Sequence, residues 1–160
     1  MKQDGELFLK LTDQDGLTSH GEYWVTADSD EHDWKHGNWY ITPISHFASY
    51  QSLLSLSPSK LKIVVSKQSG EINLTISNFT KKLAFFVEMV LLDAKGVPLS
   101  YTYWSDNYIT LHPRETRYLI CHYSPTATPS IIVIRPWDSE AIKILLSDKG
   151  GKEQLLHTYK

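Results

Sequence analysis

Residues 100–116, with the sequence SYTYWSDNYITLHPRET, bring together side chains that can take part in catalysis or ligand binding. The segment holds carboxylates at Asp106 and Glu115, an imidazole, a guanidinium and several aromatic rings. Glycoside hydrolysis requires two carboxyl groups that face each other across a cleft. Glu88 is a further carboxylate, but a single small domain offers no deep pocket for a sugar ring between any two of these groups. We therefore expect no catalytic residue in this chain.

Residues 28–36 form the densest group of candidate metal ligands: Asp28, Asp30, Glu31, His32, Asp33 and His36. An EF-hand loop needs acids at alternate positions, then a glycine and a distal glutamate, and this spacing is absent. The two histidines are four residues apart, but the segment shows no helical periodicity and offers no third ligand beside them. The pattern favours a solvated loop, with neither a metal site nor a cofactor.

The rings of Trp34, Trp39, Tyr40 and Trp104 combine flat apolar faces with polar edges, a surface that suits a pyranose ring. Large aromatic side chains are also common in interface cores. Two interpretations stay open. The connector that carries Trp34 and Trp39 is either a strap that packs on neighbouring strands or a platform that binds an oligosaccharide, and we favour the strap.

The overall composition excludes several classes of partner. The 160 residues carry 16 basic and 18 acidic side chains, with no long run of either sign, so the basic stripe that nucleic acid and anionic membranes require is absent. No stretch approaches the ~20 apolar residues of a membrane span, and the first residues form no signal peptide. The chain is expected to be cytosolic or a piece of a larger protein. The single cysteine, Cys121, excludes an internal disulfide and lies in a strand-like run that favours a buried thiol.

Apolar alternation predicts an all-β fold. The run ELFLKLTDQDGLTSHGEYWVT alternates on both sides of Asp13-Gln14-Asp15-Gly16, which is typical of a hairpin. Residues 27–58 lose this pattern, apart from one helical turn expected in SHFASYQSLLSL. Seven short runs then follow between residues 60 and 137, rich in β-branched residues and separated by turn signals. This spacing predicts an immunoglobulin-like β-sandwich.

The predicted organisation has four parts. Residues 1–27 form the last hairpin of a preceding β-sandwich domain, because two strands alone are marginal in water. Residues 28–58 are an aromatic linker, since a connector of this length is uncommon inside one compact domain. Residues 59–138 form the sandwich, and residues 139–160 are a C-terminal extension with one additional edge strand.

This architecture gives the opening segment a structural interpretation. Ser105, Asp106 and Asn107 are suited to a turn, because Asp and Asn side chains bond to nearby backbone and tolerate left-handed conformations. Tyr108 then begins a strand, and Pro113 and Glu115 belong to a second turn that closes it. We expect these residues to form a structural motif.

The same segment resembles a known family. YWSDNYITLHPRE is similar to the Tyr-Ser-Asp-Asn-Tyr-Phe-x-Leu-x-Pro-Gly-Glu signature of glycoside hydrolase family 2 enzymes of the β-mannosidase and exo-β-glucosaminidase type. GEYWVTADSDEHDWKHGNWYITP resembles the aspartate-tryptophan connector that leads into the terminal immunoglobulin-like module of these enzymes, and NFTKKLAFFVEMVLLDAKGVPL resembles one of the hairpins of that module. The sequence departs from the family at Arg114, where the turn usually has glycine, at Gly21 and Ser49, and at IRPWD.

The resemblance implies a non-catalytic accessory module whose partners are the other domains of a parent glycosidase. The catalytic glutamates of that family lie in a barrel for which this chain is too short. A parent enzyme of this type implies a periplasmic or secreted location.

Overall fold

The computed structural model describes residues 5–16, 18–146 and 153–156. The chain divides into two compact units, Met1–Ser55 and Leu56–Lys160. Residues 1–4 and 17 of the predicted hairpin, and residues 147–152 and 157–160 of the predicted extension, lie outside the described residues. The four predicted segment boundaries stay predictions. In the described part of the chain, no helix is long and apolar enough to cross a membrane.

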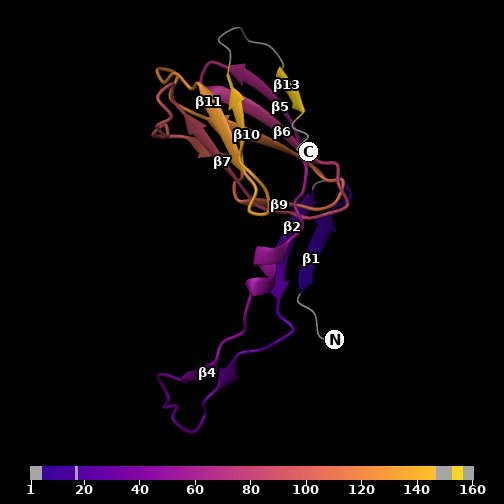
Figure 1. Ribbon diagram of the computed structural model, residues 1–160, viewed down its shortest axis with the longest axis vertical. Coiled ribbons are helices and arrows are strands. Elements are labelled where there is room, and N and C mark those ends of the chain that lie inside the picture. Colours follow the sequence, from indigo (N-terminus) through magenta and orange to yellow (C-terminus); the bar gives the residue numbers. More distant parts are fainter. Residues whose placement is uncertain (1–4, 17, 147–152, 157–160) are drawn as a thin grey trace. The chain divides into compact units, whose positions relative to one another are not determined.

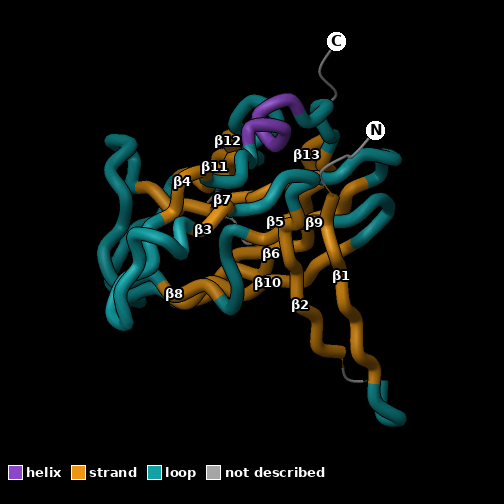
Figure 2. Tube along the Cα trace, turned by 90° about the horizontal axis from the view of Figure 1, so that it is seen from below, coloured by secondary structure: helices purple, strands orange, loops and turns teal. Residues whose placement is uncertain are grey.

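Strands make up most of the regular structure (Figures 1 and 2). In chain order the described elements are β1 (Gly5–Thr12), β2 (Thr18–Val25), β3 (Glu31–His32), β4 (Ile44–His46), the 3₁₀ helix η1 (Gln51–Ser55), β5 (Leu61–Gln68), β6 (Glu71–Asn78), β7 (Ala84–Leu92), β8 (Tyr103–Trp104), β9 (Ile109–Leu111), β10 (Thr116–His122), β11 (Ile131–Arg135), β12 (Ile142–Leu145) and β13 (Glu153–Leu156).

The first unit contains the predicted hairpin. β1 and β2 pair antiparallel from Gly5 opposite Val25 to Thr12 opposite Thr18. The turn between them has the predicted chemistry. The Gly16 N–H donates to the Asp13 carbonyl at 3.2 Å, the Asp15 N–H donates to the Asp13 carboxylate at 2.9 Å, and Gly16 has a positive φ of 81°.

Residues 26–50, here called the arm, follow the hairpin and were expected to lack regular elements. β3 and β4 pair in a very short ribbon, with Glu31 opposite His46. The helical turn expected in residues 45–56 is present just after the arm, as η1. Side chains supply much of the remaining structure. The Ala48 N–H donates to the Asp30 carboxylate at 2.8 Å, and the Ser45 hydroxyl donates to the Glu31 carbonyl at 3.1 Å.

The second unit is a β-sandwich, as the sequence predicts (Figure 1). Within the described residues one sheet has the order β13-β5-β6-β10-β8 and the other the order β12-β11-β7-β9. All seven predicted runs contain a strand, although the run at residues 99–104 is reduced to β8. The pairing is antiparallel throughout the described ladders of both sheets.

Alternate residues of long strands such as β5 and β6 build the core between the two sheets. In β6, Ile72, Leu74 and Ile76 are buried while the residues between them are partly exposed. They pack in one cluster with residues of the opposite sheet, including Leu91 and Ile134. An inward side chain at every second position is what a two-layer sandwich requires.

The predicted C-terminal extension contributes strands to the two sheets. β12 pairs with β11, with Ile144 opposite Ile132, and buries Ile142 and Ile144 in the core. β13 pairs with β5 in the other sheet. A single edge strand was expected here, so the described residues add a second one. The sequence predicted one strand too few, because a four-residue strand shows little alternation of apolar and polar residues.

Asn78, at the end of β6, is a buried polar side chain whose hydrogen bonds are made inside the fold. Its amide group donates to the carbonyl oxygens of Lys82, at 2.6 Å, and Leu111, at 3.1 Å. Its side-chain oxygen accepts from the N–H and the hydroxyl of Thr80. One side chain therefore joins the β6–β7 turn to β9.

We expect Asn78→Ala to lower the free energy of unfolding by about 2–3 kcal/mol, because it removes four hydrogen bonds, including the buried one to the Leu111 carbonyl. Urea denaturation followed by tryptophan fluorescence measures the loss. Asn73→Ala is the matched control, since Asn73 lies on the same strand, is partly exposed and bonds only to the Glu71 carboxylate among the contacts of its amide group shown in the described structure. Equal losses in the two variants would contradict this role of Asn78.

Candidate functional site

The segment Ser105–Tyr108 makes hydrogen bonds to β10 and β7 and leads into β9. The Ser105 N–H donates to the Ile120 carbonyl at 2.8 Å, and the Ile120 N–H donates to the Ser105 hydroxyl at 3.0 Å. Ser105 thus extends the pairing of β8 with β10 by one residue. The chain bends at residues 105–106.

Asn107 attaches the turn to β7. Its side-chain oxygen accepts from the Met89 N–H at 2.8 Å, and its side-chain nitrogen donates to the Met89 carbonyl at 3.0 Å. The amide group therefore takes the place of a neighbouring strand residue opposite Met89. The same oxygen accepts from the Tyr108 N–H at 2.9 Å, which fixes the backbone where β9 begins.

The carboxylates that could have suggested catalysis are used in structural contacts. Glu115 accepts from the His112 N–H at 2.8 Å and pairs with Arg117. Asp106 accepts from the Asn107 N–H at 2.9 Å and lies 3.8 Å from a guanidinium nitrogen of Arg117. These bonds hold the two turns around β9 together.

Pro113 and Arg114 form the centre of the second turn. The Glu115 N–H donates to the His112 carbonyl at 3.0 Å, and Arg114 has a positive φ of 66°. Proline at the second position and a left-handed residue at the third are typical of a type II turn, whose third position favours glycine. Arg114 is therefore strained at the position where the resembling family has glycine.

Tyr108 belongs to a cluster that the sequence did not predict, here called the aromatic patch: Phe86, Glu88, Tyr108, Arg135 and Trp137. The ring centroids of Phe86 and Tyr108 are 5.1 Å apart. The Tyr108 hydroxyl donates to Glu88 at 3.1 Å, and Arg135 donates to the other oxygen of Glu88 at 2.7 Å. The carboxylate of Glu88 raises the pKa of Tyr108, chiefly because it accepts the phenolic hydrogen bond. The runs AFF and RPW contain aromatic residues of this cluster, but the alternation of apolar and polar residues does not show that the two runs share one surface.

Three of the four predicted sugar-binding residues, Trp34, Trp39 and Tyr40, lie in the arm. Trp39 is 86% exposed, and Trp34 and Tyr40 are also exposed. The rings of Trp39 and Tyr40 lie against each other with centroids 4.2 Å apart. Asn38 holds this loop, because its side-chain oxygen accepts from the N–H groups of Tyr40 and Ile41. The packing of these rings on the sandwich stays a prediction.

Trp104, the fourth candidate, lies in the second unit on β8. It is partly buried and packs against the hydrophobic core. Trp104 and the three arm residues therefore belong to different units of the chain. Cys121, on the neighbouring strand β10, is buried as predicted, and burial raises the pKa of its thiol to about 11.

The acidic residues of the arm pair with histidines. Asp33 contacts the His36 imidazole at 2.6 Å, and this hydrogen bond lowers the pKa of Asp33. Asp28 contacts His46 at 2.6 Å, and its hydrogen bond and charge raise the pKa of His46. Both contacts are exposed and link residues within the arm, and the absence of a metal site there stays a prediction.

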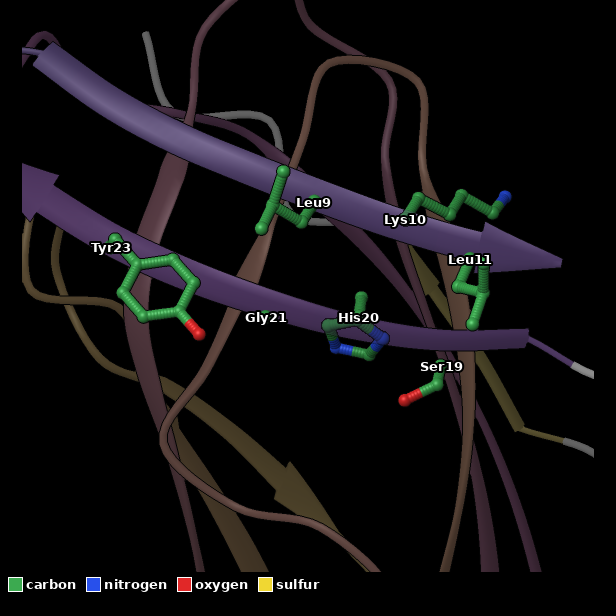
Figure 3. Close-up of a pocket in the computed structure, with 7 residues that line it drawn as sticks. All are labelled: Leu9, Lys10, Leu11, Ser19, His20, Gly21 and Tyr23. Carbon is green, nitrogen blue, oxygen red and sulfur yellow. The ribbon is translucent and has the colours of Figure 1, made fainter.

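One face of the hairpin is apolar and exposed. Because opposite residues share a face, the register puts Leu7, Leu9, Leu11, Tyr23 and Val25 together, and each is half or more exposed. A shallow hollow in this region includes Leu9, Leu11 and Tyr23 (Figure 3). Gly21 allows the Tyr23 ring to lie over the β2 backbone, since a Cβ at Gly21 would be 3.3 Å from that ring. We call these five residues the apolar hairpin face.

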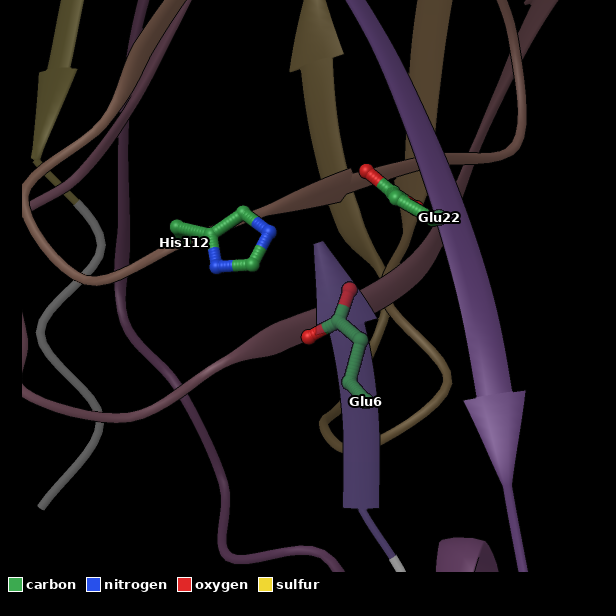
Figure 4. A group of neighbouring side chains, drawn as sticks. All are labelled: Glu6, Glu22 and His112. Carbon is green, nitrogen blue, oxygen red and sulfur yellow. The ribbon is translucent and has the colours of Figure 1, made fainter. Parts of the chain in front are cut away.

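The opposite face of the hairpin carries Glu6 and Glu22 (Figure 4). Glu6 is opposite Trp24 and Glu22 is opposite Phe8, so both carboxylates lie on the same side of the two strands. Figure 4 also draws His112, which is a residue of the second unit. Two carboxylates are fewer than the ligands of a calcium or structural zinc site, and we assign no metal to the hairpin.

Comparisons with known proteins agree with the fold. The family model described as the exo-beta-D-glucosaminidase Ig-fold domain matches residues 39–139. The exo-beta-D-glucosaminidase of Hypocrea jecorina is 32% identical over 155 residues, which cover 91% of this chain and 16% of that protein. The exo-chitosanase CsxA of Amycolatopsis orientalis, solved in complex with PNP-beta-D-glucosamine, superposes with a TM-score of 0.69 at 28% identity. That match covers 86% of this chain and 17% of the solved chain.

The arrangement of the two sheets and the matching family model together define the class of fold, which is an immunoglobulin-like β-sandwich. The chain belongs to the exo-β-D-glucosaminidase Ig-fold domain family. This confirms the predicted resemblance to the immunoglobulin-like module of glycoside hydrolase family 2 enzymes of the exo-β-glucosaminidase type. The finer expectation of a β-mannosidase-like enzyme has no support from these relatives. The chain spans about one sixth of the length of the two relatives described above.

Arg114→Gly should stabilise the sandwich by ~1 kcal/mol, because glycine adopts a positive φ without the steric cost that an L side chain pays. Thermal unfolding followed by circular dichroism measures the change as a rise in Tm. Arg117→Gly is the control and should lower Tm, since Arg117 lies inside β10 and pairs with Glu115. A lower Tm for Arg114→Gly would show that its side chain stabilises the turn more than its backbone strains it.

Proposed function

We propose that this chain is the non-catalytic accessory β-sandwich at the C-terminal end of an exo-β-D-glucosaminidase-type glycoside hydrolase, and that it packs on the other domains of that enzyme and stabilises them. The observation that carries the proposal is the apolar hairpin face. It consists of five large apolar side chains on a two-stranded sheet that buries no residue among those described.

Such a hairpin is not expected to be stable by itself. A two-stranded sheet is marginal in water, and an exposed apolar face of this kind typically marks a contact with another protein surface. If the hairpin forms the end of a preceding β-sandwich, its apolar face covers the core of that domain and its strands gain neighbours. The relatives support such a partner, because the matched region is a small part of each.

The carboxylates support a structural role for the sandwich. Glu88 and Glu115 each accept a hydrogen bond and pair with an arginine, Arg135 and Arg117 respectively. A general acid or nucleophile must instead reach a substrate. We place the hydrolytic residues of the parent enzyme outside this chain.

The test is a chimera in which this chain replaces the matching region of the exo-chitosanase of Amycolatopsis orientalis. We expect the isolated chain not to cleave PNP-beta-D-glucosamine and the chimera to cleave it. Leu9→Gln, in the apolar hairpin face, should lower the Tm of the chimera by more than about 5 °C and leave the Tm of the isolated chain unchanged. Lys10→Gln, on the opposite face of β1, is the matched control. Equal effects of the two variants in the chimera, or turnover by the isolated chain, would refute the proposal.

A second candidate function, oligosaccharide binding, is favoured by the exposure of Trp39 and Tyr40. Their preorganised rings lie in an arm with four carboxylates, at Asp28, Asp30, Glu31 and Asp33, and one lysine. Exposed rings beside negative charge suit a chain of cationic amino sugars.

Sugar binding makes a separate prediction for the isolated chain. Chitosan hexamer should produce saturable shifts of the Trp39 indole signal in NMR spectra, and Trp39→Ala should abolish binding without changing Tm. Cellohexaose, which lacks the amino groups, is the control ligand and should bind more weakly. A strap packed on the sandwich predicts the reverse: no shifts, and a loss of ~3–5 kcal/mol of stability in Trp39→Ala.

A further inference from the structure

The aromatic patch lies on the surface of the sheet that contains β7, β9 and β11. Arg135 is opposite Glu88 in the β7–β11 ladder, and both side chains project away from the core, because their neighbours Ile134 and Met89 are buried in it. Trp137, just after β11, is exposed, and its N–H donates to the Phe85 carbonyl at 3.0 Å. This bond holds Trp137 beside the segment that carries Phe86.

Phe86 and Tyr108 both have strained backbones. Their φ angles are 49° and 55°, in the left-handed region that side chains with a Cβ disfavour. Phe86 lies in a bulge of β7, where the register with β9 shifts between Ala84 and Val87. Bulges of this kind change the direction of a side chain and are frequent beside functional sites.

Burial inside the sandwich does not explain this strain. Phe86 remains 44% exposed and Tyr108 50% exposed. Strained residues persist where the surroundings determine their conformation, and they are concentrated at binding sites. The bulge and the turn thus hold the two rings against each other at the surface. In this position each ring is only partly buried.

The surroundings of the two rings make the patch rigid and nearly neutral. Asn107 fixes the backbone of Tyr108 through Met89, and Glu88 bonds to both the Tyr108 hydroxyl and Arg135. A rigid surface loses little conformational entropy on binding. The ion pair cancels the charge of the carboxylate, so the patch offers no net negative charge to a cationic amino sugar.

We propose that the aromatic patch is a second docking surface of the sandwich, separate from the apolar hairpin face, and that its occupant is another domain of the same glycosidase polypeptide. This inference rests on the proposed function. Tyr, Trp, Phe and Arg are the residues enriched in protein interfaces and in their energetic hot spots. The match covers 17% of the solved chain, so most of that enzyme is available as the occupant. The surface of the other domain that contacts the patch is apolar at its centre and provides hydrogen-bond acceptors to the remaining N–H groups of Arg135.

The chimera described above tests this surface through replacements that suit a left-handed backbone. Phe86→Asn and Tyr108→Asn remove the rings but keep a residue that tolerates positive φ. Tyr101→Asn is the matched control, because Tyr101 has a φ of 57°, is 92% exposed and lies outside the patch. In the isolated chain we expect all three to change Tm by less than about 3 °C. In the chimera, the two patch variants should lower Tm by more than about 5 °C and the control should not.

The Leu9→Gln chimera separates failure of this inference from failure of the proposed function. If Leu9→Gln destabilises the chimera and the patch variants do not, the accessory role stands and the docking surface is refuted. If Leu9→Gln has no effect, or the chimera does not fold, both are refuted. Equal destabilisation of the isolated chain and the chimera by Phe86→Asn would assign the rings to the internal packing of the sandwich.

Two further measurements on the isolated chain identify a different occupant. Sedimentation equilibrium that shows a dimer, converted to a monomer by Phe86→Asn, would assign the patch to contact between two copies. Saturable NMR shifts of Tyr108 with chitosan hexamer would assign it to sugar. Either result overturns the proposed docking of another domain.

Discussion

The constraint on which the sandwich depends is that every second side chain of its long strands points into the space between the two sheets. A shift of one residue in any ladder would turn these side chains outward, so the buried run of Ile72, Leu74 and Ile76 fixes the register of β6. The turns and polar bonds depend on this register. Asn78 illustrates the dependence, because its four hydrogen bonds require β6, the following turn and β9 to be in place.

The elements that sequence predicts well are those whose signal is local. Alternation over eight residues and the turn chemistry of Asp13 and Gly16 were sufficient for the hairpin, and the same reasoning located the strands from β5 to β11. The β3–β4 ribbon and the second strand of the extension were not predicted. Each spans four residues or fewer per strand, and the ribbon is supported by side-chain bonds such as that from Ala48 to Asp30. No periodicity exists in segments of that length.

In the candidate site, too, the sequence predicts features with a local signal and does not predict contacts that depend on tertiary structure. A turn at residues 105–107 follows from composition, but its attachment to Met89, 18 residues earlier in the chain, depends on which strands become neighbours. The aromatic patch depends on tertiary structure still more strongly. Phe86 and Tyr108 come together only because a bulge in β7 and a left-handed residue before β9 bring the two rings to one surface. Sequence alone names such residues as aromatic and gives no reason to group them.

The two units differ in how far they satisfy their own apolar side chains. The sandwich buries a continuous core between its sheets, whereas the hairpin and arm leave Leu9, Tyr23 and Trp39 largely in contact with solvent. Since burial of apolar surface is the main favourable term in folding, the sandwich is the unit that provides its own stability. The hairpin and arm are held by two-stranded ladders, by turns and by exposed Asp–His hydrogen bonds, and such a ladder is marginal in water by itself. Their exposed apolar side chains are the reason for proposing that the first unit packs on another domain. The strained backbones of Phe86 and Tyr108 show that even the sandwich has a surface feature that its own core does not explain.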